Sequence, residues 1–243
     1  MHIFKPACLI LTCLAFSATA QEAEIYIPGS QATQPSVSAS PQSALAGCLI
    51  DPSAQNCAGI NLDPSGTQLE SMIGGSQIQL ETLVLNPGTG QVTSTPQPPA
   101  TKPDYTAPTP TYGTVTLPAV AITIEFDFNR ADIRYDQFGK ITSLVQAMKD
   151  PALQATPFAV IGHTDASGSD YYNCDLSRRR ANAVAQELGR QYVLVPLYSV
   201  GFGEHVLKNT YNPRAAENRR VTFLRLPDDY ASILATSQAV CPG

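Results

Sequence analysis

Hydrophobic residues in the second half of the chain recur at spacings typical of alternating strands and helices. Residues 120–128 alternate β-branched and aromatic side chains with others and predict a strand. Residues 134–149 place apolar side chains three and four positions apart, which predicts an amphipathic helix, and 157–162 is a short apolar run that predicts a buried strand. Further along, the same patterns predict one helix and two strands, over 175–190, 196–200 and 220–226.

Strands that alternate with helices indicate an α/β fold. We expect a two-layer sandwich over residues 115–227, in which a mixed β-sheet carries helices on one face. A segment of about 110 residues is long enough to bury such a core. A largely irregular N-terminal region is expected to precede it.

The rest of the chain lacks this periodicity. Residues 21–44 are rich in Ser, Gln, Ala and Pro, which predicts a disordered segment. Residues 45–85 are expected to form a small disulfide-containing segment with one strand or one short helix near its end. Residues 86–114 are rich in Pro and Thr and predict a stiff linker, and 228–243 are expected to form a C-terminal tail.

Residues 1–20 have the pattern of a secretory signal peptide. Lys5 supplies a positive charge, an apolar stretch follows, and Ala18 and Ala20 are placed for cleavage. A lipoprotein signal at Cys13 is a less favoured alternative, because Thr12 precedes it where a small residue is usual. We therefore expect export to the periplasm, with association with the outer membrane left open.

Four cysteines remain after the predicted cleavage site. In an oxidising compartment they predict two disulfides, for which three pairings exist. We favour Cys48–Cys57, which are close in sequence, and this leaves Cys174–Cys241. A zinc site is disfavoured because no CxxC pair or nearby His accompanies them, and we expect no other metal and no cofactor.

Charge is distributed unevenly along the sequence. Residues 21–117 hold seven acids and one base, whereas 118–226 hold eleven acids and thirteen bases. This balance is too near neutral for a nucleic-acid-binding protein, which needs a strong basic excess on one face.

The predicted loop after the strand at 157–162 carries candidate chemistry. Asp165 follows that strand directly, and ligands of α/β sheets bind at the carboxyl ends of strands. On the next helix, the phase set by its buried apolar residues points Arg179 to water and Arg180 towards this loop. The alternatives are an aspartate that closes a turn, or a surface ion pair between Asp165 and Arg180 that contributes about 0–1 kcal/mol.

Several motifs occur here in a fixed order. HTDxxG starts at His163, YNxxLSxxRAxxV spans 172–184, and GFGE (201–204) and NRRV (218–221) follow. Over about 115–226 the chain resembles the C-terminal domain of outer membrane protein A (OmpA), which is shared with the lipoprotein Pal and the stator protein MotB. It departs from the family at 205–208, where a proline is usual.

The resemblance implies noncovalent binding of peptidoglycan. It assigns Asp165 and Arg180 to the ammonium and carboxylate groups of diaminopimelate in the stem peptide, since one anion and one bidentate cation suit a zwitterionic group. We place Thr164, Asn173, Leu176 and Arg219 in the same site, although Leu176 is most simply a core residue.

Two other functions compete with this one. In the wall-binding hypothesis, residues 21–111 serve as a tether or as the segment that meets an envelope protein partner. The domain is alternatively a structural or assembly component of the envelope that itself docks proteins. A hydrolase would use His163, Asp165 and Ser177, but no oxyanion-hole motif or metal-ligand set accompanies them. We therefore predict that the protein is not an enzyme and has no catalytic residues.

Overall fold

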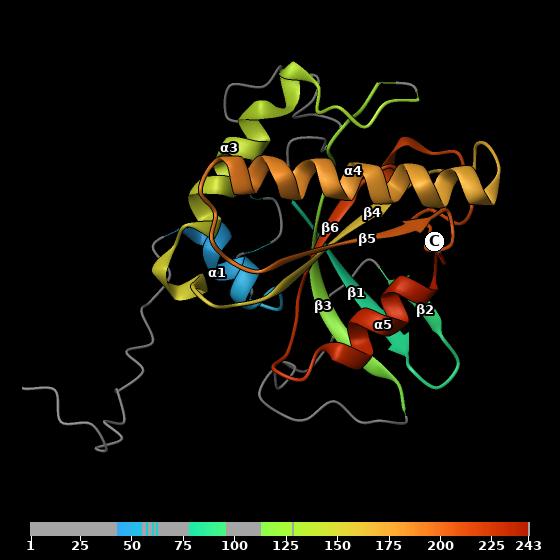
Figure 1. The fold of residues 1–243 in the computed structure, drawn as a ribbon, viewed down its shortest axis with the longest axis horizontal. Helices are drawn as coiled ribbons and strands as arrows, with labels where there is room; N and C mark the ends of the chain where they lie inside the picture. The colour runs from blue at the N-terminus through green and yellow to red at the C-terminus, as the bar shows by residue number, and fades with distance from the viewer. Residues whose placement is uncertain are drawn as a thin grey trace, which may run out of the picture. The chain divides into compact units, whose positions relative to one another are not determined.

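The computed structural model describes residues 43–54, 57, 60, 62, 78–95, 113–127 and 129–242. The predicted signal peptide, the predicted disordered segment up to residue 42 and most of the predicted linker lie outside these ranges. The described residues form a six-stranded sheet with helices packed on it (Figure 1).

The strand order in the sheet is β2-β1-β3-β6-β4-β5. Neighbouring strands are antiparallel, except that β4 and β5 are parallel. The prediction of a mixed sheet is therefore confirmed. The strands are β1 Gln79–Asn86, β2 Gln91–Thr95, β3 Val115–Ile122, β4 Phe158–His163, β5 Leu197–Gly203 and β6 Val221–Arg225.

Four α-helices and three single turns of 3₁₀ helix accompany the sheet in the described residues. Within them no helix combines the length and the apolar character needed to cross a membrane. The helices are α1 Ala44–Ile50, α3 Phe138–Met148, α4 Asp170–Arg190 and α5 Ala231–Ala239, and the turns are η1 Tyr135–Gln137, η2 Pro151–Leu153 and η3 Ala216–Asn218.

Helices cover both faces of the sheet. Phe158 and Val160 of β4 pack in one apolar cluster with residues of α1, α3 and α4. Ala159 and Ile161 alternate with them and pack in a second cluster that contains Ile233 of α5. Figure 1 shows α4 and α5 on opposite sides of the strands. The predicted helices α3 and α4 pack on one face of the sheet. In addition, α5 packs on the other face and is formed by residues that were expected to be a C-terminal tail.

The predicted linker at 86–114 is wrong at its start, because residues 86–95 belong to a β-hairpin. Asn86 closes the turn through its side-chain Oδ1, which accepts hydrogen bonds from the N–H groups of Gly88 and Thr89 at 3.0 and 3.2 Å. Gly90 follows with φ of +70°. The sequence NPGTG resembles a spacer in composition, but these contacts make it a tight turn between β1 and β2.

The segment at 45–85 is not a separate unit either. Leu45 and Leu49 of α1 join the cluster under α3 and α4, and β1 pairs with β3 along most of its length. The strand predicted at 120–128 begins earlier and ends at Ile122, so the chain leaves the sheet before Phe126. This departure brings Phe126 to the candidate site.

Both favoured disulfides are present. Cys48–Cys57 bridges 9 residues and ties the end of α1 to the chain that follows. Cys174–Cys241 bridges 67 residues and ties α4 to the C-terminal end.

Candidate functional site

One pocket of about 310 Å³ lies where β4 ends and α4 begins. The structure brings all six predicted binding residues to it, and their part in binding stays a prediction. Four residues that were not among the predicted binding residues also line the pocket. The lining residues are Phe126, Asn129, Thr164, Asp165, Ser167, Tyr172, Asn173, Leu176, Arg180 and Arg219.

Asp165 lies on the loop that follows β4, with its side chain 12% exposed. Its Oδ1 accepts a hydrogen bond from the Ser167 N–H at 3.0 Å, so the carboxylate closes a turn as well as lining the pocket. Its Oδ2 lies 2.7 Å from Nη1 of Arg219. The cation paired with Asp165 is therefore Arg219, and Arg180 is left for another anion.

Arg180 is only 6% exposed and approaches the pocket from α4. Its guanidinium carbon lies 4.9 Å from the ring centroid of Phe126, and its Nε donates to the carbonyl of Arg130 at 3.2 Å. Burial lowers the pKa of Arg180 to about 10, so the group stays protonated at neutral pH. Among the described side chains it forms no ion pair, which leaves its terminal N–H groups for an anion in the pocket.

The three consecutive arginines of α4 take different partners. Arg178 donates to the carbonyl of Cys241 at 2.6 Å, and Arg179 pairs with Asp175 on the exposed side of the helix at 2.8 Å. Arg180 alone of the three lines the pocket. The prediction from helical phase, that Arg180 faces the loop and Arg179 faces water, is confirmed.

Hydrogen bonds order the rest of the pocket wall. Asn173 is 1% exposed and its Nδ2 donates to Oε2 of Glu204 at 2.6 Å. The Tyr172 hydroxyl donates to Oδ1 of Asn129 at 2.6 Å. Thr164 lines the pocket and is 3% exposed, and its buried Oγ1 has no hydrogen-bond partner among the described atoms.

Close packing of α4 on the sheet sets the position of Arg180. A side chain at Gly162 would put Cβ 2.1 Å from the carbonyl oxygen of Ser177, and one at Gly201 would put it 2.6 Å from Ser177 Oγ. Ser177 Oγ donates to the Cys174 carbonyl and accepts from the Gly203 N–H, both at 2.9 Å. Ser177 is thus part of the packing between helix and sheet.

The hydrolase arrangement is not formed. His163 is buried, and its Nε2 lies 3.1 Å from Oγ1 of Thr222, while the hydroxyl of Ser177 is engaged with the backbone. Burial, assisted by the charge of Arg220, lowers the pKa of His163 well below 6.5. A neutral histidine bonded to a threonine does not activate Ser177 as a nucleophile.

The disulfide at Cys174 does not cover the pocket, because neither cysteine lines it. The sulfurs of Cys174 and Cys241 and a ring nitrogen of His205 lie within 4.8 Å of one another. Both sulfurs are bonded to each other, and His205 Nε2 lies 2.7 Å from Oδ1 of Asp170. The cluster therefore offers no thiolate to a metal.

Sequence reasoning missed the contribution of the chain that follows β3. Phe126 falls within the strand predicted at 120–128, and Asn129 and Arg130 follow it, but β3 ends at Ile122, so all three residues lie beyond the strand. Their place beside Arg180 follows from where β3 ends, which local sequence patterns do not specify.

Comparison with known proteins agrees with the motifs. Residues 125–220 match the OmpA family. The chain is 37% identical over 106 residues to outer membrane porin F of Pseudomonas aeruginosa, and 36% identical over 105 residues to the porin F of Pseudomonas fluorescens. These matches cover 42% of this chain and only 30% and 32% of the two relatives.

Solved structures also match the C-terminal part. The peptidoglycan-associated lipoprotein from Burkholderia pseudomallei is 22% identical with a TM-score of 0.35, covering 42% of this chain and 87% of that one. A cell wall anchor of the T6SS from Pseudomonas aeruginosa is 23% identical with a TM-score of 0.36, covering 46% and 82%. The match to the OmpA family itself covers residues 125–220 of the 243-residue chain, which carry an OmpA-like domain.

Proposed function

We propose that this protein binds peptidoglycan noncovalently through the diaminopimelate of the stem peptide, and so anchors itself to the cell wall. The observation that carries the proposal is the lining of one pocket by an aspartate and by a buried arginine with no ion-pair partner among the described side chains. The OmpA-like motifs and the similarity to outer membrane porins support it.

The chemistry of the pocket suits a zwitterionic amino-acid group. The carboxylate of the ligand would take the terminal N–H groups of Arg180, and its ammonium would take the free lone pairs of Asp165. Arg219 already shares Asp165 and holds the carboxylate in place before the ligand arrives. Thr164 Oγ1 and the wall made by Asn173 and Leu176 would add polar and apolar contacts.

A single stem peptide would bind with moderate affinity, since each charge-assisted hydrogen bond contributes about 1.5–3 kcal/mol. The cell wall presents many copies, and avidity would make attachment firm. This function places the protein in the periplasm at the outer membrane, in line with the porins to which it is similar.

Sedimentation with purified peptidoglycan sacculi tests the proposal. Wild-type protein should sediment with sacculi, whereas Arg180→Ala and Asp165→Asn should stay in the supernatant. Arg179→Ala is the matched control, because it removes a neighbouring arginine whose partner is Asp175 on the exposed side. If Arg180→Ala sediments with sacculi as fully as Arg179→Ala and the wild type do, the pocket is not the binding site.

The diaminopimelate assignment has its own test. Sacculi whose stem peptides carry lysine lack the second carboxylate, so Arg180 would have no anion to bind. Wild-type protein should bind them at least tenfold more weakly than diaminopimelate sacculi, about 1.4 kcal/mol or more. Equal binding to both kinds would contradict the assignment while leaving wall binding intact.

A further inference from the structure

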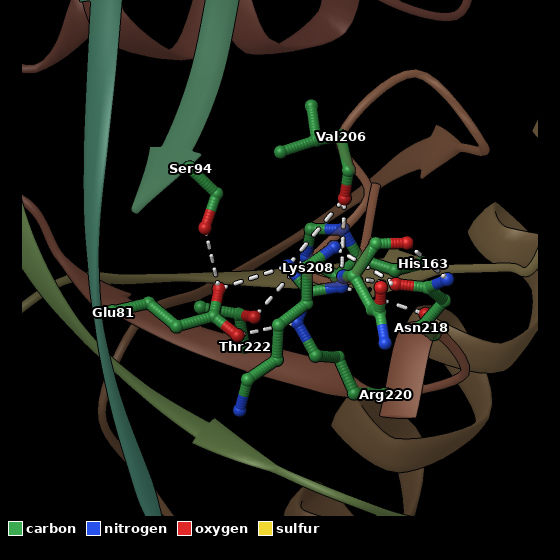
Figure 2. A network of polar contacts seen from close by, with 9 residues as sticks. Glu81, Ser94, His163, Val206, Lys208, Asn218, Arg220 and Thr222 are labelled. Atoms are coloured by element: carbon green, nitrogen blue, oxygen red, sulfur yellow. Dashed lines mark hydrogen bonds and ion pairs between the residues drawn. The ribbon is translucent and has the colours of Figure 1, made fainter. Parts of the chain in front are cut away.

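A buried ion pair joins the β1–β2 hairpin to the strand that follows the site. Glu81 of β1 and Arg220, just before β6, have side chains that are both 0% exposed. Arg220 Nε lies 2.5 Å from Oε1 of Glu81, and its Nη2 lies 2.9 Å from Oε2. Ser94 of β2 donates to the same carboxylate at 3.0 Å (Figure 2). Glu81 and Ser94 lie outside the segment that matches the OmpA family.

Arg220 also faces the loop between β5 and β6. Its guanidinium lies 3.4 Å from the carbonyl oxygen of Val206 and 3.5 Å from that of Asn218. Asn218 is 0% exposed, and its Oδ1 accepts from the N–H groups of Lys208 and Asn209 at 2.9 and 2.8 Å. Figure 2 shows Arg220 between Glu81 on one side and Val206 and Asn218 on the other.

This loop reaches the ligand site. The Nδ2 of Asn218 donates to the carbonyl of Pro213 at 3.1 Å, and the same carbonyl accepts the N–H of Ala166 at 3.0 Å. Ala166 follows Asp165 directly. Arg219, the residue before Arg220, contacts Asp165 itself. Asp165 is therefore held both by Arg219 and by the loop that Arg220 and Asn218 organise.

We propose that Glu81 is a positioning residue for the binding site, acting through Arg220, and that the binding unit therefore includes the β1–β2 hairpin. The inference rests on the proposed function. It adds the β1–β2 hairpin, which lies outside the segment that matches the OmpA family, to the residues that shape the site. Glu81 supplies the only charge that Arg220 pairs with among the described residues. With that charge in place, the guanidinium can stay buried and keep its contacts to the loop.

A paired substitution separates this role from general stability. Glu81→Leu/Arg220→Met replaces the buried pair by apolar side chains of similar size, a change that proteins often tolerate without loss of stability. The variant also lacks the donors to the Val206 and Asn218 carbonyls. We expect its thermal unfolding midpoint to stay near that of the wild type and its affinity for sacculi to fall about 2- to 30-fold. Glu81→Gln, which leaves a buried unpaired arginine, should instead lower the unfolding midpoint.

Amide hydrogen exchange gives a readout that a purely structural role would not change. In the double variant the N–H groups of Ala166 and Asn209 should exchange faster, whereas those in the centre of β4 should keep wild-type rates. Asp175→Ala/Arg179→Ala is the control, because it removes an exposed ion pair from the same domain. It should change neither exchange at these sites nor sacculus binding.

The outcomes distinguish the two proposals. Wild-type affinity and wild-type exchange at Ala166 in a folded double variant would overturn the role of Glu81. A second outcome is that the wild-type protein does not bind sacculi, while the Ala166 N–H exchanges faster in the double variant than in the wild type. That outcome would support the positioning role and overturn the proposed ligand. Loss of affinity with unchanged exchange at Ala166 would also contradict positioning through the loop.

Discussion

Residues two positions apart at the end of β4 have very different surroundings. His163 is buried, bonded to Thr222 and packed edge-on against Phe202, with ring centroids 5.4 Å apart. Asp165 lines the pocket and is paired with Arg219. The same contrast holds for two neighbouring arginines: Arg219 pairs with Asp165 at the pocket, whereas Arg220 pairs with the buried Glu81. Residues that line the pocket and residues buried in the interior are therefore only one or two positions apart in the sequence.

The buried histidine makes stability depend on pH. Burial and the charge of Arg220 lower the pKa of His163 well below 6.5, so the folded protein keeps it neutral. Below about pH 6.5 the unfolded chain binds a proton there that the folded chain does not, and the free energy of unfolding falls. We expect this contribution to reach about 1.4 kcal/mol per pH unit between the unfolded and the folded pKa.

Urea unfolding between pH 5 and 8 measures this effect. His163→Gln removes the titrating group, so its unfolding free energy should fall less steeply with acidification than that of the wild type. Parallel curves for the two proteins would show that His163 takes up no proton on unfolding.

At the scale of elements, the contact between α4 and the sheet controls where Arg180 lies. Glycines at 162, 201 and 203 allow the helix backbone to approach β4 and β5 closely. Gly203 also adopts a φ of +51°, which favours glycine. The helix that carries Arg180, Asn173 and Leu176 is therefore placed by residues on the strands beneath it.

Gly162→Ala should destabilise the protein, because its Cβ would lie 2.1 Å from the carbonyl oxygen of Ser177. Moving the helix to relieve this clash is expected to cost about 1–3 kcal/mol of unfolding free energy and to weaken sacculus binding. Gly189→Ala, in the same helix, meets no atom within 4 Å and should be neutral or stabilise by up to about 1 kcal/mol. Chemical denaturation of both variants checks this, and equal stabilities would contradict the packing argument.

At the scale of the whole molecule, the two disulfides within the described part of the chain differ in span. Cys174–Cys241 closes 67 residues and Cys48–Cys57 closes 9, so the first restricts the unfolded chain more. Cys174→Ser/Cys241→Ser should lose about 2–4 kcal/mol of unfolding free energy, and Cys48→Ser/Cys57→Ser should lose less.

Neither Cys174 nor Cys241 lines the pocket, so sacculus binding by that double variant should persist below its unfolding temperature. Urea titrations rank the two disulfides, and sedimentation with sacculi tests the site. Loss of binding in a folded Cys174→Ser/Cys241→Ser variant would show that the C-terminal end shapes the pocket.

The sequence by itself determined what depends on local spacing. Apolar periodicity located α3, α4 and β4, and helical phase separated Arg180 from Arg179. The order of the motifs brought Asp165 and Arg180 together as candidates. These features are local because a helix or strand repeats its side-chain directions every few residues.

Only the tertiary structure decided which distant residues meet. It placed residues 86–95 in a hairpin, Glu81 beside Arg220, Arg219 on Asp165 and Phe126 against Arg180. It also put α5 on the second face of the sheet. Apart from the hairpin, these contacts join residues that lie far apart in the sequence, such as Asp165 and Arg219 or Glu81 and Arg220. Burial and charge pairing in the folded chain determine these contacts. The spacing of residues along the sequence does not specify them.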